Sequence, residues 1–251
     1  MSTIRLFVPD PLAEGARVRL SPAQAHYLAA VMRRAAGDTV LVFNGRDGEW
    51  RARIAALGKG EARLAPEART RPQEPAPDLW LLAPVLRRET LEWMVEKATE
   101  LGVSRVVPVT SDRSAVARTN AQRLAAIATE AAEQCRRLDV PAIAEPAPLA
   151  AVLAAWDPGR MLLVADESGR APPVAALLRG AEAGPWAVLV GPEGGFGERE
   201  LDGFRDLPFC RTASLGPRIL RAETAAVAAL AVLQALAGDW VANGPHDPHL
   251  R

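Results

Sequence analysis

The sequence is poor in the features that mark secreted, membrane and metal-binding proteins. It has two cysteines, Cys135 and Cys210, without CxxC spacing, so we expect neither a disulfide framework nor a cysteine metal or redox site. The N-terminal stretch MSTIRLFVPD lacks the apolar core of a secretory signal, and the longest apolar stretch, 225–237, is shorter than the ~20 residues of a membrane helix. Because no targeting signal is found, we expect a soluble, cytoplasmic protein.

Histidine is also scarce. The three histidines are His26, His246 and His249. The last two lie in a short segment with proline and glycine, and His26 stands alone, where a packing role is the simpler interpretation. We therefore predict no metal site.

Lysine is nearly absent, and the charge is unevenly distributed although the net charge is zero. Lys59 and Lys97 are the only lysines, so arginine carries almost all the positive charge. Through residue 74 there are 12 basic and 8 acidic residues, and the remainder has 18 and 22. This excess slightly favours a nucleic-acid partner for the first part of the chain. An ordinary solvated surface explains it equally well.

Residues 1–72 read as a small β-rich domain. Short strands are predicted at 4–8, 17–20, 39–43 and 49–55, and the Asn-Gly and Asp-Gly pairs between the last two are typical of a hairpin. Ser21 and Pro22 begin one helix, whose apolar residues recur at helical spacing up to Met32. The pattern predicts a small β-barrel that carries one helix.

Residues 73–251 read as a larger α/β domain. The proline-rich segment 69–78 separates it from the first domain. Beyond it, apolar strands alternate with helices, which predicts a mostly parallel sheet with helices on both faces. The strands are expected at 79–85, 105–110, 161–166, 186–191 and 212–215. The last helix, 223–237, is apolar nearly all round, so we expect it to be buried against the sheet and a second subunit.

Two loops of the second domain carry unusual sequences. Gly191-Pro-Glu-Gly-Gly195 follows a predicted strand and precedes a helix, but it matches neither a P-loop nor the GxGxxG pattern. Taken alone, it fits a structural turn as well as a binding site. The second loop, Leu215-Gly-Pro-Arg-Ile-Leu-Arg-Ala-Glu-Thr224, follows the next strand, and alone it fits a helix start. Together they present backbone at one edge of a sheet, where open α/β folds bind ligands.

The two loops resemble the signature of a known family. GPEGGF at 191–196 and LGPRILRAETA at 215–225 are similar to the SPOUT methyltransferases, and within them to the RsmE family. Further blocks follow in the family's order: KATELGV at 97–103, Arg113-Ser114, and EAAEQ at 130–134 with Arg137. In the first domain, the family's PUA-like barrel is resembled by His26-Tyr-Leu, Val31, Arg33, Gly37-Asp38 and Phe43 to Gly45. Arg34, Asn44, Asp112 and Arg136 depart from the family pattern, and none of them lies in the two loops.

The resemblance implies a fold, a reaction and partners. The fold is a PUA-like RNA-binding β-barrel followed by a SPOUT domain with a C-terminal trefoil knot, assembled as a homodimer. The reaction is S-adenosylmethionine-dependent methylation of N(3) of a uridine in 16S ribosomal RNA, or in the assembled small subunit. The alternatives are a ribose 2′-O-methyltransferase of the same fold and a non-catalytic RNA-binding factor in ribosome assembly.

The resemblance also assigns candidate residues. The expected cofactor contacts come from the two loops: Leu189, Gly191, Glu193, Gly194, Gly195, Leu215, Gly216, Ile219 and Leu220. Uracil N(3) is a poor nucleophile until its proton leaves, so the reaction needs a base or a cation that stabilises the uracil anion. We predict Arg221 as the cation and Glu223 as a weaker candidate for the base. Capping of the last helix is the alternative for both, and capping is also the alternative for Glu193.

The expected RNA contacts are arginines of both domains, because phosphate contacts supply affinity and register. They are Arg5, Arg17, Arg33, Arg34, Arg113 and Arg137. For each arginine alone, a solvated surface is the simpler interpretation, so the prediction concerns the set.

Overall fold

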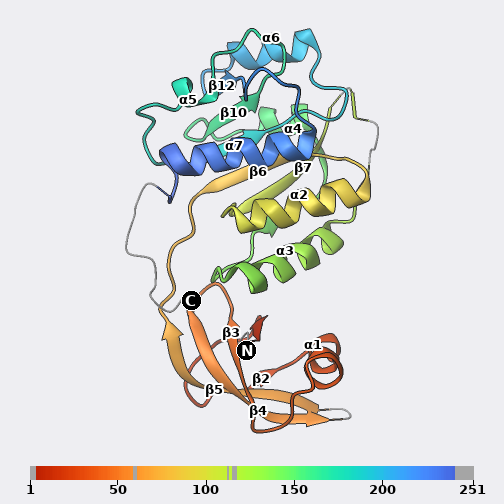
Figure 1. Ribbon diagram of the computed structural model, residues 1–251, viewed down its shortest axis with the longest axis vertical. Coiled ribbons are helices and arrows are strands. Elements are labelled where there is room, and N and C mark those ends of the chain that lie inside the picture. Colours follow the sequence, from red (N-terminus) through yellow and green to blue (C-terminus); the bar gives the residue numbers. More distant parts are fainter. Residues whose placement is uncertain (1–3, 59–60, 112, 115–117, 241–251) are drawn as a thin grey trace. The chain divides into compact units, whose positions relative to one another are not determined.

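The computed structural model describes residues 4–58, 61–111, 113–114 and 118–240 (Figure 1). His246 and His249 therefore lie outside the described residues. The chain forms two compact units, one of residues 1–75 with Thr129–Val140 and one of Ala76–Ala128 with the residues from Pro141 onward. The boundary expected at residue 72 did not anticipate that 129–140 fold with the first unit.

The first unit is built on a five-stranded sheet. Its strands are β1 (Arg5–Phe7), β2 (Val18–Arg19), β3 (Thr39–Phe43), β4 (Glu49–Gly58) and β5 (Glu61–Arg71), in the order β1-β3-β4-β5-β2. β1 pairs with β3 in parallel and the other pairs are antiparallel. The core of this unit is formed by alternating apolar residues such as Leu6, Val42, Ile54 and Leu64, because successive side chains of a strand point to opposite faces.

The single helix of this unit begins where the sequence predicted. The Ser21 hydroxyl accepts a hydrogen bond from the Gln24 amide, and the Gln24 side chain accepts one from the Ser21 amide, so a capping box starts α1 (Pro22–His26). A π-helical turn, Tyr27–Val31, continues it. The helical stretch ends at Val31 with Met32 as its C-cap, and Arg33 just beyond it has a φ of 51°, in the left-handed region.

β5 was not predicted. Pro66 lies in the middle of the strand, which is unusual because proline has no N–H to donate to a sheet ladder. The structure accommodates Pro66 opposite Ala52, directly beside a shift in register between Arg51 and Ala52.

Buried hydrogen bonds join the sheet of the first unit to the end of α3 (Ala121–Cys135). The Arg5 guanidinium donates to the Glu49 carboxylate at 2.7 Å and to the carbonyl oxygens of Ala132, Glu133 and Arg137 at 3.0–3.1 Å. Burial raises the pKa of Glu133, although its carboxylate accepts the Phe7 amide at 2.9 Å. Ala132 and Leu138 also pack against Phe43, so residues 129–140 belong to the first unit.

The second unit is an α/β layer structure. The strands β6 (Leu79–Pro84), β7 (Arg105–Thr110), β8 (Ala142–Ile143), β10 (Met161–Ala165), β11 (Trp186–Leu189) and β12 (Cys210–Ala213) have the order β12-β10-β11-β6-β7-β8, and β9 (Ala147–Pro148) pairs with β7. All these pairs are parallel. The predicted mostly parallel sheet is confirmed.

Helices cover both faces of this sheet. On one face, α4 (Leu149–Ala154) and α6 (Glu198–Asp206) pack through Leu149, Leu201 and Phe204 on alternate strand residues such as Val164 and Leu189. On the other face, α2 (Arg88–Glu100) and α7 (Ala222–Ala237) lie side by side (Figure 1). A short helix, α5 (Val174–Leu177), follows β10. A trefoil knot requires the chain to pass through one of its own loops, which strand order and pairing do not show. The knot therefore stays a prediction.

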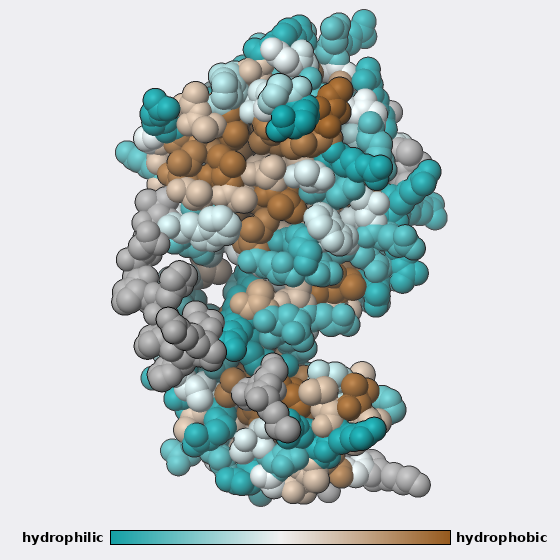
Figure 2. All heavy atoms as spheres, in the orientation of Figure 1, coloured by the Kyte–Doolittle hydropathy of each residue, from teal (hydrophilic) through white to brown (hydrophobic). Residues whose placement is uncertain are grey.

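α7 is only half buried in the single chain. Ala226, Ala229, Leu230 and Leu233 form its buried stripe, with at most 2% of each residue exposed, whereas Leu236 is 38% exposed. Hydrophobic side chains gather over α7 on the face seen in Figure 2. Among the described residues, no helix is long and apolar enough to cross a membrane.

Candidate functional site

Three loops meet at the carboxyl edge of the parallel sheet. Val164 of β10 pairs with Leu189 of β11, and the next residue, Ala165, pairs with Ala213 of β12. The loops after these strands, 166–173, 190–197 and 214–221, therefore start at nearly the same level. β10 lies between β11 and β12, so its loop separates the two loops that sequence analysis singled out. Ligands of open α/β sheets bind at this edge.

The glycine loop, 191–197, is tightly folded. The Gly195 amide donates to the Pro192 carbonyl at 2.9 Å, and Gly195 has a φ of 64°, which favours glycine. A Cβ atom on Gly191 would lie 3.3 Å from the Gly195 Cα and from the Phe196 ring. The Phe196 side chain is buried between β11 and α6. The predicted cofactor contacts Gly191, Glu193, Gly194 and Gly195 therefore lie in one compact turn, whereas Leu189 is the buried last residue of β11 before it.

α6 begins directly after this loop. The Gly197 amide donates to the Glu200 carboxylate at 2.8 Å, so Glu200 closes the first turn of the helix. The Glu193 side chain is exposed. Capping of α6 is thus performed by Glu200, and the electrostatic role predicted for Glu193 stays a prediction.

The second loop, 214–221, is joined to the loop after β10. The Ser214 amide donates to the Pro172 carbonyl at 2.8 Å, and the Val174 amide donates to the Ser214 carbonyl at 2.9 Å. Gly216 has a φ of 119°. Leu215 and Leu220 are half-buried, whereas Ile219 is 86% exposed.

Arg221 and Glu223 lie where this loop enters α7. Arg221 occupies the N-cap position, but its exposed side chain makes no capping hydrogen bond and has no partner among the described residues. Glu223 is half-buried in the first turn. A capping role for the Arg221 side chain is therefore not supported, and its cation is free to act on a ligand.

Asp166 shapes the loop after β10. Its buried carboxylate accepts the Ser168 amide at 2.8 Å and pairs with Arg205 at 2.9 Å. Burial opposes ionisation, but these hydrogen bonds outweigh it and lower the pKa of Asp166. The next residue, Glu167, reaches back to the glycine loop, where its carboxylate accepts the Phe196 amide at 3.1 Å.

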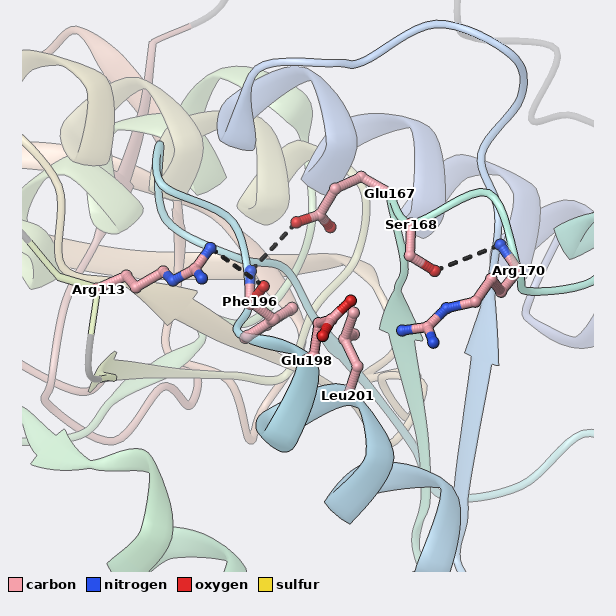
Figure 3. A pocket seen from close by; sticks show the side chains of 7 residues that line it. All are labelled: Arg113, Glu167, Ser168, Arg170, Phe196, Glu198 and Leu201. Carbon is pink, nitrogen blue, oxygen red and sulfur yellow. Dashed lines mark hydrogen bonds between the residues drawn. The ribbon is translucent and has the colours of Figure 1, made fainter.

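A pocket of about 470 Å³ opens between the loop after β10 and α6 (Figure 3). It is lined by Arg113, Glu167, Ser168, Arg170, Phe196, Glu198 and Leu201. None of the predicted cofactor contacts lines it, although Phe196 directly follows them. Sequence analysis missed Glu167, Ser168 and Arg170. The signal for them was the polar turn Asp166-Glu-Ser-Gly169 at the carboxyl end of a correctly predicted strand.

The six predicted RNA contacts differ in their surroundings. Arg17 and Arg33 are exposed, and Arg34 is half-buried. Arg5 is buried against Glu49, and its burial leaves no surface for a phosphate, so it carries a structural contact in place of the predicted one. Arg137 forms a mostly buried pair with Asp139 at 2.8 Å. Arg113 donates to the Gly194 carbonyl at 3.0 Å. No group of three or more metal-binding side chains occurs among the described residues.

Comparison with known proteins places this chain in a family. Residues 72–234, more than half of the chain, match the RNA methyltransferase domain, and residues 20–67 match the RNA methyltransferase PUA domain. The ribosomal RNA small subunit methyltransferase E of Synechocystis is 32% identical, and the match covers 91% of this chain and 76% of that protein. The chain belongs to the ribosomal RNA small subunit methyltransferase E family.

Other members of this family match over nearly their full length. The enzyme of that name from Rickettsia conorii is 29% identical over 92% of this chain and 95% of its own. The structure of the Neisseria gonorrhoeae member, bound to S-adenosyl methionine, has a TM-score of 0.85 and 27% identity, covering 95% of this chain and all of that one. These matches confirm the fold class, including the PUA-like first domain.

Proposed function

We propose that the protein methylates N(3) of a uridine in 16S ribosomal RNA of the small subunit, with S-adenosylmethionine as methyl donor. The observation that carries the proposal is the glycine loop and its neighbouring loops at the sheet edge, in a chain that belongs to this methyltransferase family. The Neisseria family member binds S-adenosyl methionine in its structure. We place the protein in the cytoplasm, where its RNA substrate is assembled into subunits.

The glycine loop suits a ligand that is held by backbone groups. Gly191, Gly194 and Gly195 have no side chains of their own, so a ligand can approach the loop backbone closely, although the Gly194 carbonyl and the Gly195 amide are already hydrogen-bonded within the protein. Leu215 and Leu220 of the second loop supply apolar surface. Glu193, exposed beside the loop, supplies a negative charge for a cationic sulfonium. These residues would hold S-adenosylmethionine, which supplies an electrophilic methyl group when bound.

The remaining residues serve the uracil. As the bond from N(3) to the methyl carbon forms, the carbon–sulfur bond breaks and its electron pair returns to sulfur. The N(3) proton must leave, and the Glu223 carboxylate is the candidate acceptor. Arg221, whose guanidinium has no partner among the described residues, stabilises the negative charge on the uracil ring.

A methylation assay tests the reaction. Small subunits from a bacterial strain that lacks this modification are incubated with the protein and labelled S-adenosylmethionine, and the RNA is digested and analysed by mass spectrometry. We expect one methylated uracil base per subunit. Methylation on a ribose would overturn the N(3) assignment, and absence of both transfer and S-adenosylmethionine binding would overturn the enzymatic one. Gly195→Trp is the control, because the indole would displace Glu167 and cover the loop, so binding should be lost.

The first unit is the proposed RNA platform. The exposed side chains of Arg17 and Arg33 have no hydrogen-bond or ion-pair partner among the described residues. Exchanging both for glutamine should weaken RNA binding and flatten its salt dependence by up to about two units of slope, roughly one per lost phosphate contact. The matched control is Arg53→Gln, because Arg53 is exposed on the same unit but already paired with Glu67 at 2.6 Å. An equal effect of the control would show that general charge is the cause.

A second copy of this chain is the proposed occupant of the outer face of α7. The exposed Leu236 lies on this mostly apolar helix beside its buried stripe. Because water-exposed apolar surface of this kind is a common feature of protein interfaces, we expect light scattering to give twice the mass of the chain. A mass equal to one chain would remove the homodimer from the proposal.

A further inference from the structure

We propose that Arg113 and Glu167 are positioning residues that hold the glycine loop in its ligand-binding conformation from two sides. Arg113 follows β7 and Glu167 follows β10, and these strands lie on opposite sides of β11, which carries the loop. The inference rests on the proposed function only for the identity of the ligand. We do not propose that either side chain touches the reacting atoms.

Arg113 holds the carbonyl side of the loop. Its Nη1 atom donates to the Gly194 carbonyl at 3.0 Å. It also donates, more weakly, to the Phe196 carbonyl at 3.4 Å, and this second contact is drawn in Figure 3. The two residues also lie close together, since a Cβ atom on Gly194 would be 3.3 Å from the Arg113 Cβ and 3.7 Å from its Cδ. A guanidinium suits this task because its several N–H groups have a fixed planar geometry.

Glu167 holds the amide side of the loop. Its carboxylate accepts a hydrogen bond from the amide of Phe196, which lies between Gly195 and the start of α6. It occupies the space beside Gly195 that a side chain there would need. The loop backbone is thus bound by a cation through its carbonyls and by an anion through its amide, and both hydrogen bonds are charge-assisted.

The loop needs external support because its own sequence is permissive. Gly191, Gly194, Gly195 and Gly197 lie within seven residues, and glycine loses more conformational freedom on ordering than any other residue. Within the loop, one backbone hydrogen bond is formed, from Gly195 to Pro192. A loop that is ordered before binding avoids that entropy loss when the ligand arrives, so the two side chains should raise affinity without touching the ligand.

Arg113 therefore has two competing roles. Sequence analysis expected an RNA contact, whereas the structure directs its guanidinium to the loop carbonyls. The two roles predict different results when the side chain is removed. Loss of an RNA contact changes the RNA affinity and its dependence on salt, whereas loss of a positioning residue changes the affinity for S-adenosylmethionine.

Titration calorimetry with S-adenosylmethionine and RNA-binding assays at several salt concentrations separate the two. Arg113→Gln should weaken S-adenosylmethionine binding roughly tenfold, the effect of losing one hydrogen bond of about 1.4 kcal/mol, and should leave RNA affinity unchanged. Glu167→Gln keeps an acceptor oxygen, so it should bind nearly as well as the parent, whereas Glu167→Ala should not. The matched control is Arg199→Gln, which removes an exposed charge beside the loop that forms no hydrogen bond or ion pair with the described residues.

A second readout does not depend on the ligand. In the ligand-free protein, Glu167→Ala should speed hydrogen exchange of the Phe196 amide, while Glu167→Gln and Arg199→Gln should not. The inference is overturned if Arg113→Gln weakens RNA binding but not S-adenosylmethionine binding. It is also overturned if Arg113→Gln and Glu167→Ala both keep the parental S-adenosylmethionine affinity and the parental rate of amide hydrogen exchange. A parent protein that does not bind S-adenosylmethionine would instead reject the proposed function, and the exchange rates would still decide the positioning role.

Discussion

Arg221→Ala should lower the single-turnover rate of methylation at saturating RNA by a factor on the order of 10² to 10³, the range for loss of one preorganised electrostatic donor. Arg221 is exposed at the start of α7, beside the second loop, and its side chain has no partner among the described residues. Its removal should cost little stability. The loss should appear in the chemical step, because stabilisation of the uracil anion is gained only as the proton leaves.

The comparison that makes this result specific is Arg218→Ala. Arg218 is an exposed arginine of the same loop, also without a partner among the described residues, so its removal changes the local charge equally. We expect its single-turnover rate to stay within a few-fold of the parent. If Arg221→Ala reacts at the parental rate once RNA is saturating, Arg221 is a binding contact and the catalytic cation must be sought elsewhere. Glu223→Gln tests the base separately, because removing the proton acceptor should also lower the single-turnover rate at saturating RNA.

Arg5→Ala should destabilise the protein by about 3–5 kcal/mol, the cost of leaving a buried partner charge uncompensated. The Arg5 and Glu49 side chains are 5% and 6% exposed. Removing the guanidinium also leaves the carbonyls of Ala132 and Arg137 without this donor. Urea denaturation, followed by a spectroscopic signal that reports on the first unit, measures this loss of stability. The urea concentration at the midpoint of unfolding should be lower than in the parent protein.

Arg53→Ala is the matched control for stability. Its ion pair with Glu67 is as short, at 2.6 Å, but the Arg53 side chain is 52% exposed, so we expect a loss of at most about 1 kcal/mol. A double change, Arg5→Met with Glu49→Leu, should recover part of the stability because no buried charge is left unpaired. If Arg5→Ala and Arg53→Ala unfold at the same denaturant concentration, the buried pair does not join the end of α3 to the sheet as described.

Several elements could be predicted from sequence because neighbouring residues encode them. β3 and β7 have the predicted bounds, since a short run of apolar residues is a local property of the sequence. The capping residues Ser21 and Gln24 mark the start of α1 within three positions of one another. The family resemblance was also readable at this level, because the motifs of the glycine loop and the second loop are contiguous.

The neighbours of each element were decided by tertiary structure. The sequence indicated that β11 and β12 carry the two motif loops, but the sheet order places β10 between them, and this adds the loop with Glu167 to the site. Strand order in a parallel sheet depends on how the crossover helices pack, and residues within one strand do not record it. Glu167 therefore read as an ordinary acidic residue after a strand.

The roles of the arginines show the same division. Arg5, Arg33 and Arg113 are alike in sequence, where each is a polar residue near a strand or helix end. The fold buries Arg5 on Glu49, leaves Arg33 in solvent and directs Arg113 to the carbonyl of Gly194. Sequence by itself determined the family, the fold class and the two loops, because these depend on contiguous patterns. Only the tertiary structure decided which charges are buried, paired or free, because those properties depend on residues that are 44, 81 or more positions away along the chain.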